Sequence, residues 1–195
     1  MTPLATAAAP ILQAAQLAAE NGPALLAIDG RCGSGKSTLA EFLAGQLGCR
    51  VMHTDDFYLP LAARCSNWQE QPGANMDFIR LRNQVLQPLL RGETALYNAY
   101  SCAAGAFLPS KPFAAAPLTI LEGSYSLHPA LQTDFAVRVF VTCPPDVQEA
   151  RLQAREGIRY ANFVQRWIPL EEGYFAAHDP AARCNFVLDT AEIFV

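Results

Sequence analysis

One eight-residue segment near the N-terminus constrains this chain more than any other feature. Residues 30–37 read GRCGSGKS and match the pattern G-x-x-x-x-G-K-[S/T]. Glycines permit backbone conformations that other residues avoid, so successive N–H groups of such a loop can turn inward onto a phosphate. An apolar run, residues 24–29, precedes the segment, and a helical pattern, residues 38–47, follows it. A strand, this loop and a helix in that order predict a site for a nucleoside triphosphate.

The spacing within the loop predicts a chemical role for each of its fixed residues. The helix after the loop would present free N–H groups and the positive end of its dipole to the phosphates. Lys36 would reach the β- and γ-phosphates as a catalytic residue, and the Ser37 hydroxyl would be a ligand of Mg²⁺. The residues expected to bind the nucleotide here are Gly30, Gly33, Ser34, Gly35, Lys36, Ser37 and Thr38.

The order of apolar runs predicts the fold. Strands are expected at residues 24–29, 49–54, 117–123, 136–142 and 184–189. Helical patterns lie at residues 1–20, 38–47, 76–90, 146–156 and 161–177, the last despite Pro169. Nearly continuous apolar strands that alternate with helices favour an α/β fold with a parallel sheet covered on both faces. We therefore expect one P-loop NTPase domain over residues 1–195, a three-layer sandwich with a mainly parallel five-stranded sheet and a helical lid at about 145–165. Residues 92–116 show no sustained period and stay unassigned.

Three carboxylates should lie where ligands bind in such sheets, beyond the carboxyl ends of the strands. Asp55 and Asp56 follow the second strand, and Glu122 ends the third. An aspartate near the γ-phosphate can accept a proton from an attacking hydroxyl. A carboxylate after the third strand is placed to hold Mg²⁺ or its water. For each of the three, the alternative is a helix cap or a solvated loop acid.

Three arginines recur at intervals of four residues after the fourth strand, namely Arg151, Arg155 and Arg159. If the helix continues that far, they share one face. Guanidinium groups on a mobile lid can stabilise a transferring phosphoryl group, because their planar fork binds two phosphate oxygens. We assign Arg155 to catalysis and the other two to nucleotide binding. The alternative is a solvated helix face with Glu149 and Glu156 as partners.

Composition excludes several other classes of protein. The chain has 14 basic and 18 acidic residues, a net charge of −4, which argues against a nucleic-acid partner. No run of about 18 apolar residues is present, so we expect no membrane partner, and the alanine-rich N-terminus lacks the basic residues of a targeting segment. None of the six cysteines has zinc or CxxC spacing, so buried free thiols in the cytoplasm are expected. The sequence does not decide the oligomeric state, and both a monomer and a homodimer are compatible with it.

Several motifs together resemble the uridine kinase-like branch of P-loop kinases, which includes nicotinamide riboside kinase and, more distantly, pantothenate kinase and phosphoribulokinase. The segments that carry the resemblance are GRCGSGKS, TDDFY at 54–58, PGANMDFIRL at 72–81, ILEGSYSL at 120–127, RLQARE at 151–156 and RWIPLEEGYF at 166–175. They span most of the chain in the family's order. TDDFY and LEGSY at these separations are more specific than the phosphate loop, which many families share.

The resemblance implies roles for individual residues. Asp55 matches the aspartate that activates the 5′-hydroxyl of a ribosyl substrate, and Asp77 matches one that binds sugar hydroxyls. Glu122 matches the Mg²⁺-associated acid, and the implied cofactors are ATP and Mg²⁺. Tyr97 and Tyr100 lie in the segment that contacts the pyrimidine in uridine kinases. That segment lacks the family's Asp, Phe and His here, and the Arg-Gly pair common after the lid is also absent. Without the resemblance, Asp77 would be an acid at a helix N-terminus.

Several functions remain open from the sequence. The preferred one is an ATP-dependent kinase acting on a hydroxyl of a small molecule, a nucleoside or related ribosyl metabolite. A second is a kinase of a non-nucleoside alcohol such as pantothenate or a sugar. A nucleotide-dependent switch would need D-x-x-G after the third strand and an N-K-x-D motif, and the chain has Glu122-Gly123 and no N-K-x-D. An inactive homologue that only binds nucleotide is the last alternative, and Lys36 and Asp55 argue against it.

Overall fold

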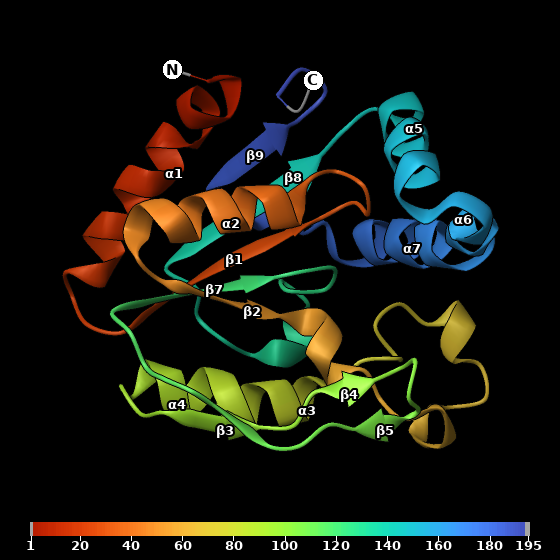
Figure 1. Cartoon of the computed structure of the whole chain (residues 1–195), viewed down its shortest axis with the longest axis horizontal. Helices are drawn as coiled ribbons and strands as arrows, with labels where there is room; N and C mark the ends of the chain where they lie inside the picture. The colour runs from red at the N-terminus through yellow and green to blue at the C-terminus, as the bar shows by residue number, and fades with distance from the viewer. Residues whose placement is uncertain (1, 194–195) are drawn as a thin grey trace.

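The computed structural model describes residues 2–193, which contain a central five-stranded sheet (Figure 1). Its strands lie in the order β2-β7-β1-β8-β9, and every neighbouring pair is parallel. Their bounds are β1 Ala24–Gly30, β2 Arg50–His53, β7 Leu118–Glu122, β8 Val137–Thr142 and β9 Phe186–Asp189. The predicted five-stranded parallel sheet is therefore confirmed, with each strand inside or within one residue of its expected range.

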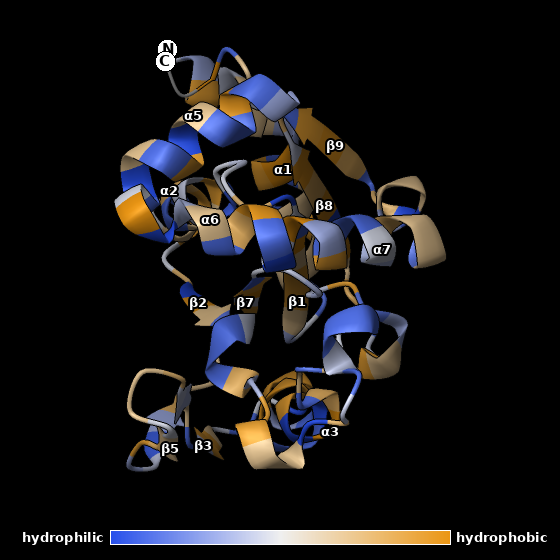
Figure 2. Ribbon diagram, turned by 90° about the vertical axis from the view of Figure 1, so that its right-hand side faces the viewer, coloured by the Kyte–Doolittle hydropathy of each residue, from blue (hydrophilic) through white to orange (hydrophobic). Residues whose placement is uncertain are grey.

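Helices cover both faces of this sheet and give the predicted three layers (Figure 1). Their bounds are α1 Pro3–Ala19, α2 Lys36–Leu47, α3 Phe78–Leu81, α4 Gln87–Leu90, α5 Pro145–Glu156, α6 Tyr160–Asn162 and α7 Ile168–His178. Because alternate side chains of a strand point to opposite faces, β1 contributes to two hydrophobic clusters. Leu26 and Ile28 pack in one cluster with residues of α1 and α2, and Leu25 and Ala27 pack in the other with residues of the 78–90 segment. Figure 2 shows the strands mostly in the colours of apolar residues between these layers.

The N-terminal segment is part of this core. Ala8, Ile11 and Ala15 on α1 are fully buried, whereas Leu17 on the same helix is largely exposed. The helix expected at residues 1–20 is therefore confirmed, and it is amphipathic. Within residues 2–193, no helix combines the length and the apolar character that crossing a membrane requires.

Two helical segments each contain a proline that follows a π-helical turn. A π-helical turn at 82–86 precedes Pro88, and another at 163–167 precedes Pro169. Proline has no N–H to donate to the carbonyl four residues earlier, and a wider turn removes the need for that bond. The helical periodicity at 76–90 and 161–177 therefore predicted both segments correctly.

The unassigned residues 92–116 form two small antiparallel pairs. β3 (Ala95–Tyr97) pairs with β6 (Lys111–Phe113), and β4 (Tyr100–Ser101) pairs with β5 (Ala106–Phe107). Strands of two or three residues are too short to show a period of two in the sequence. Long-range contacts stabilise these short strands, since Ala95, Tyr97 and Phe113 belong to the hydrophobic cluster that contains Leu25 and Ala27.

All six cysteines are free, as expected from their spacing. Only Cys32 and Cys143 are buried, while Cys65 and Cys102 are exposed and the other two are intermediate. The expectation of burial was therefore wrong for the exposed pair, because residues 61–75 and 102–105 form surface turns rather than core elements.

Candidate active site

A cavity of about 1170 Å³ lies beside the carboxyl ends of β1, β2 and β7. It is lined by the phosphate loop, by the turn after β2, by the end of β7 and by the segment from α5 to α7. Ten residues assigned to function from the sequence line it: Gly33, Gly35, Lys36, Ser37, Thr38, Asp55, Tyr100, Glu122, Arg155 and Arg159. The fold thus brings groups separated by more than a hundred residues to one place.

The phosphate loop presents backbone donors to this cavity. Gly35 precedes α2 with a φ of 91°, a conformation that suits glycine. Within residues 2–193, the backbone N–H groups of residues 33, 35, 36, 37 and 38 have no protein acceptor. Unpaired donors at a helix N-terminus form an anion site, because the helix dipole adds to their attraction. The nearly buried Lys36 ammonium donates to the carbonyls of Gly30 (2.9 Å) and Arg31 (2.7 Å).

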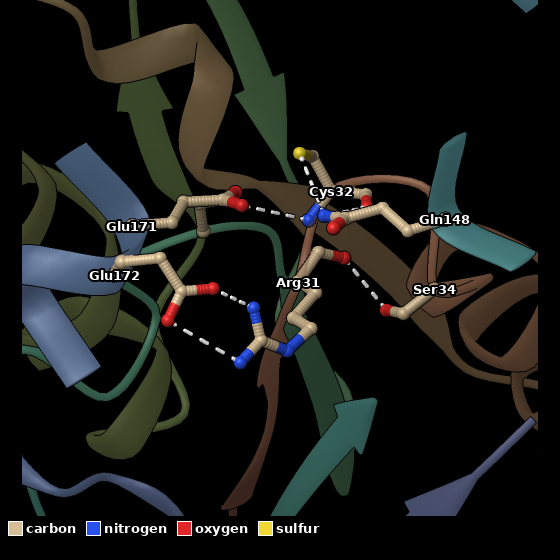
Figure 3. Close-up of polar contacts among 7 residues, drawn as sticks. Arg31, Cys32, Ser34, Gln148, Glu171 and Glu172 are labelled. Carbon is tan, nitrogen blue, oxygen red and sulfur yellow. Dashed lines mark hydrogen bonds and ion pairs between the residues drawn. The ribbon is translucent and has the colours of Figure 1, made fainter. Parts of the chain in front are cut away.

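Side chains from two helices hold the phosphate loop from either side (Figure 3). From α7, the Glu171 carboxylate accepts a hydrogen bond from the Cys32 N–H at 2.9 Å, and Glu172 forms an ion pair with Arg31. From α5, Gln148 Nε2 donates to the Cys32 carbonyl at 2.9 Å. These contacts use the N–H and C=O groups before Gly33, so they fix the loop without occupying the donors of residues 33–38.

Ser37 and Glu122, the two residues assigned to Mg²⁺, are in contact. The Ser37 hydroxyl donates to Glu122 Oε1 at 3.0 Å, and His53 Nδ1 lies 2.8 Å from Glu122 Oε2. Burial alone would raise the pKa of Glu122, but the bond with His53 and the charge of Lys36 outweigh it and lower that pKa. An ionised carboxylate and a hydroxyl are the hard oxygen ligands that Mg²⁺ takes beside substrate phosphates. These residues therefore fit a Mg²⁺ ion.

Asp55 and Asp56 both line the cavity, in a 3₁₀ turn at 54–57 rather than an extended segment. The Asp55 carboxylate reaches solvent through the cavity and accepts a hydrogen bond from the Tyr58 hydroxyl at 3.1 Å. Protein surrounds it on the other sides, and this burial raises its pKa above the ordinary value. Asp56 is held elsewhere, by the Tyr97 hydroxyl at 2.8 Å and by Lys111 at 3.5 Å. Among the described residues, Asp55 thus has one hydrogen-bond donor, Tyr58, which also lines the cavity. Asp56 is instead engaged by two other side chains.

Besides Arg151, four residues assigned from the sequence do not line the cavity. Ser34 is buried beneath the loop. Asp77 caps α3 through the Arg80 N–H (3.0 Å) and pairs with its side chain, which is the helix-terminus role that the residues alone suggested. Tyr97 packs on Phe57 and touches the site only through Asp56. Gly30, the fourth, ends β1.

Of the three arginines predicted to lie on a lid, two line the cavity and one does not. Arg151 lies outside the cavity lining and donates to the Thr190 hydroxyl (2.9 Å) and carbonyl (2.8 Å), beyond β9. Arg155 and Arg159 line the cavity, and both pair with Glu156. Arg151 and Arg155 lie four residues apart on α5, so they differ because Thr190 holds the Arg151 side chain. Gly157, with a φ of 55°, ends α5 before Arg159, which still reaches the cavity.

Sequence reasoning missed Asp29, a fully buried carboxylate at the end of β1. It accepts hydrogen bonds from the N–H groups of Gly30 (2.7 Å) and Leu127 (2.9 Å) and from the Tyr174 hydroxyl (2.8 Å). It thereby ties β1 to α7 and to the turn after β7. A charged residue that ends an otherwise apolar strand was the signal available in the sequence. Glu171, Gln148 and Thr190 gave no such signal, because their partners are distant in the chain.

Asp29 makes the stability of the fold depend on pH. Burial raises its pKa from 3.8 to about 6, so the folded protein binds a proton there more tightly than the unfolded chain. The resulting stabilisation is complete below pH ~4 and is lost as the pH rises through ~6. We expect the free energy of unfolding of the wild type, relative to Asp29→Asn, to fall by about 3 kcal/mol between pH 4 and 7. Urea unfolding across this range measures it, and a pH-independent difference would contradict the prediction.

No family model matches the chain. Solved structures with the same fold include a possible uridine kinase from Bacillus stearothermophilus, with a TM-score of 0.68 and 20% identity over 92% of this chain and 100% of that chain. A candidate fructose transport system kinase from Silicibacter sp. TM1040 has a TM-score of 0.68 and 22% identity over 96% of this chain and 99% of that chain. At these identities the similarity shows the fold alone, and this chain shares its α/β fold with both structures over nearly the whole length of each chain.

Proposed function

We propose that this chain is an ATP-dependent kinase that phosphorylates a hydroxyl of a nucleoside or related ribosyl metabolite. One observation carries the proposal. A single cavity holds the unpaired N–H groups of the phosphate loop, the contacting pair Ser37 and Glu122, and the Asp55 carboxylate. A phosphate cradle, a cation site and a base are the parts that phosphoryl transfer requires.

The proposed reaction uses these groups in fixed roles. The N–H groups of residues 33 and 35–38 and the Lys36 ammonium hold the β- and γ-phosphates. Asp55 accepts the proton of the acceptor hydroxyl while that oxygen bonds to the γ-phosphorus and the bond to the β–γ bridging oxygen breaks, releasing ADP. Arg155 and Arg159 neutralise charge on the transferring group when they leave Glu156. Most of the rate enhancement would come from positioning and electrostatics.

Ser37 and Glu122 would hold Mg²⁺, which supplies positive charge beside the phosphate oxygens. The contact between His53 and Glu122 orients that carboxylate and keeps it ionised. We further propose a cytoplasmic protein with a small-molecule acceptor and no nucleic-acid or membrane partner, as a monomer or homodimer. The free state of all six thiols supports a reducing compartment.

A second candidate is a kinase of a non-nucleoside alcohol such as pantothenate or a sugar. It is supported by the part of the cavity that Tyr100 and Cys102 line, since neither the Asp nor the His of the uridine kinase segment is present there. Both candidates share the phosphate loop, Asp55 and the reaction.

The test is an assay of ADP release across nucleosides, vitamin alcohols and sugars, with the Asp55→Asn protein as the blank. We expect Mg²⁺-dependent turnover with at least one acceptor, well above ATP hydrolysis without acceptor. Turnover with non-ribosyl alcohols alone would select the second candidate. Absence of acceptor-dependent turnover throughout, or strong selectivity for GTP binding without transfer, would overturn the kinase proposal.

A further inference from the structure

Two arginines converge on one aromatic cluster at the wall of the cavity. Arg64, from the loop after the Asp55 turn, lies 4.6 Å from the ring centre of Trp68, and Arg166, from the π-helical turn at 163–167, lies 5.7 Å from the same ring. Trp68 is almost completely buried and packs beside Trp167 at 6.3 Å. Both guanidinium groups belong to residues that line the cavity. Segments about a hundred residues apart thus place two positive charges on one indole.

These two arginines differ from the other arginines that line the cavity. Arg155 and Arg159 share the Glu156 carboxylate. Within residues 2–193, no carboxylate forms an ion pair with Arg64 or Arg166. Arg64 Nε donates to the Leu59 carbonyl at 2.9 Å, and both side chains also contact aromatic rings, Arg64 that of Tyr58 and Arg166 that of Trp167. An anion bound beside this cluster would therefore meet two guanidinium groups that have no carboxylate partner among the described residues.

Their position relates them to the acceptor rather than to the nucleotide. Arg64 also lies 5.9 Å from the ring centre of Tyr58, and the hydroxyl of that tyrosine donates to Asp55. The ring of Trp167 lies 6.4 Å from that of Tyr58. A contiguous series of contacts therefore links both arginines to the candidate base, whereas the phosphate loop is held by side chains of α5 and α7 and by Thr190.

We propose that the acceptor is an anion whose carboxylate or phosphate group is bound by Arg64 and Arg166 while its hydroxyl lies at Asp55. This inference rests on the proposed kinase function and specifies its substrate class. Guanidinium groups bind both kinds of anion in a bidentate manner. The aromatic rings hold the arginines in place and limit the entropy that binding would otherwise cost.

Acceptor pairs that differ in charge test this directly. Orotidine against uridine and pantothenate against pantothenol test a carboxylate, and ribose 5-phosphate against ribose tests a phosphate. Binding is measured by calorimetry with Mg²⁺ and a non-hydrolysable ATP analogue. We expect the anionic member of at least one pair to bind about tenfold more tightly or better, and less so at high salt. The pair with the largest ratio identifies the anion.

Variants of the two arginines test whether they cause the preference for the anionic acceptor. Arg64→Gln and Arg166→Gln should each abolish most of it, Arg64→Lys should keep part, and Arg91→Gln, far from the cavity, should leave it unchanged. Thermal unfolding of each variant checks that it folds. Equal binding of both members in every pair would overturn the proposal. The proposal would also be overturned if the glutamine variants lost affinity for the ATP analogue but still preferred the anionic acceptor. An anion preference without turnover would refute the kinase function while the anion site stands.

Discussion

Replacing Asp55 with asparagine is expected to reduce turnover about 100- to 10,000-fold, the usual contribution of a positioned general base. The amide keeps the size of the carboxylate and can still accept a hydrogen bond from Tyr58, but it cannot take the proton of the acceptor. ATP binding should stay within a few-fold of wild type, because the phosphate donors lie on the loop at 33–38. Steady-state kinetics with the best acceptor and calorimetry with the ATP analogue measure the two effects.

The pH profile and the neighbouring residue provide the controls. Burial raises the pKa of Asp55, and the ionised form is the base, so wild-type activity should fall as the pH falls through that raised pKa. The Asp55→Asn variant should lack this acid limb. Asp56→Asn makes the same change one residue away, in a carboxylate held by Tyr97 and Lys111, and should cost less than tenfold. Near-wild-type turnover of Asp55→Asn, or a larger loss at Asp56, would refute the assignment of the base.

Replacing Gly30 with alanine is expected to lower the free energy of unfolding by about 3 kcal/mol or more. A Cβ atom at this position would lie 1.9 Å from the backbone carbonyl oxygen of Val141 on β8, and neither backbone can move without opening the β1–β8 pairing. The φ of 136° adds strain for any residue with a side chain. The unfolding temperature should fall by roughly 6–12 °C, and nucleotide binding should weaken with the displaced loop.

Gly45 offers a matched control for this substitution. It lies within α2, and a Cβ atom there would meet nothing within 4 Å. Gly45→Ala should therefore stabilise the protein by up to about 1 kcal/mol, through helix propensity. Differential scanning calorimetry of both variants against wild type separates the two effects. Equal unfolding temperatures for Gly30→Ala and the wild type would show that β8 can yield at this point.

The predictable parts of the site were local ones. The phosphate loop needs only a short run of consecutive residues, and each strand of the sheet is a short apolar run with turn residues beside it, so neither depends on distant contacts. Ser37 and Glu122, both assigned to Mg²⁺ from the sequence, are in contact because adjacent parallel strands end at one edge of the sheet, which places an acid there near the loop. Arg151 shows the limit, since it lies four residues before Arg155 on α5 but its side chain is held by Thr190, a partner distant in the chain.

By itself, the sequence determined that the chain forms a parallel α/β sheet with a phosphate-loop motif after its first strand, and it supplied the candidate side chains for the site. Tertiary structure alone decided which of them face the cavity, that Glu171 and Gln148 hold the phosphate loop, and that Arg64 and Arg166 meet on one tryptophan. The physical reason is the distance along the chain over which each kind of interaction acts. Backbone propensity and side-chain periodicity act over a few neighbouring residues, whereas the direction of a long polar side chain depends on partners that only folding brings within hydrogen-bond distance.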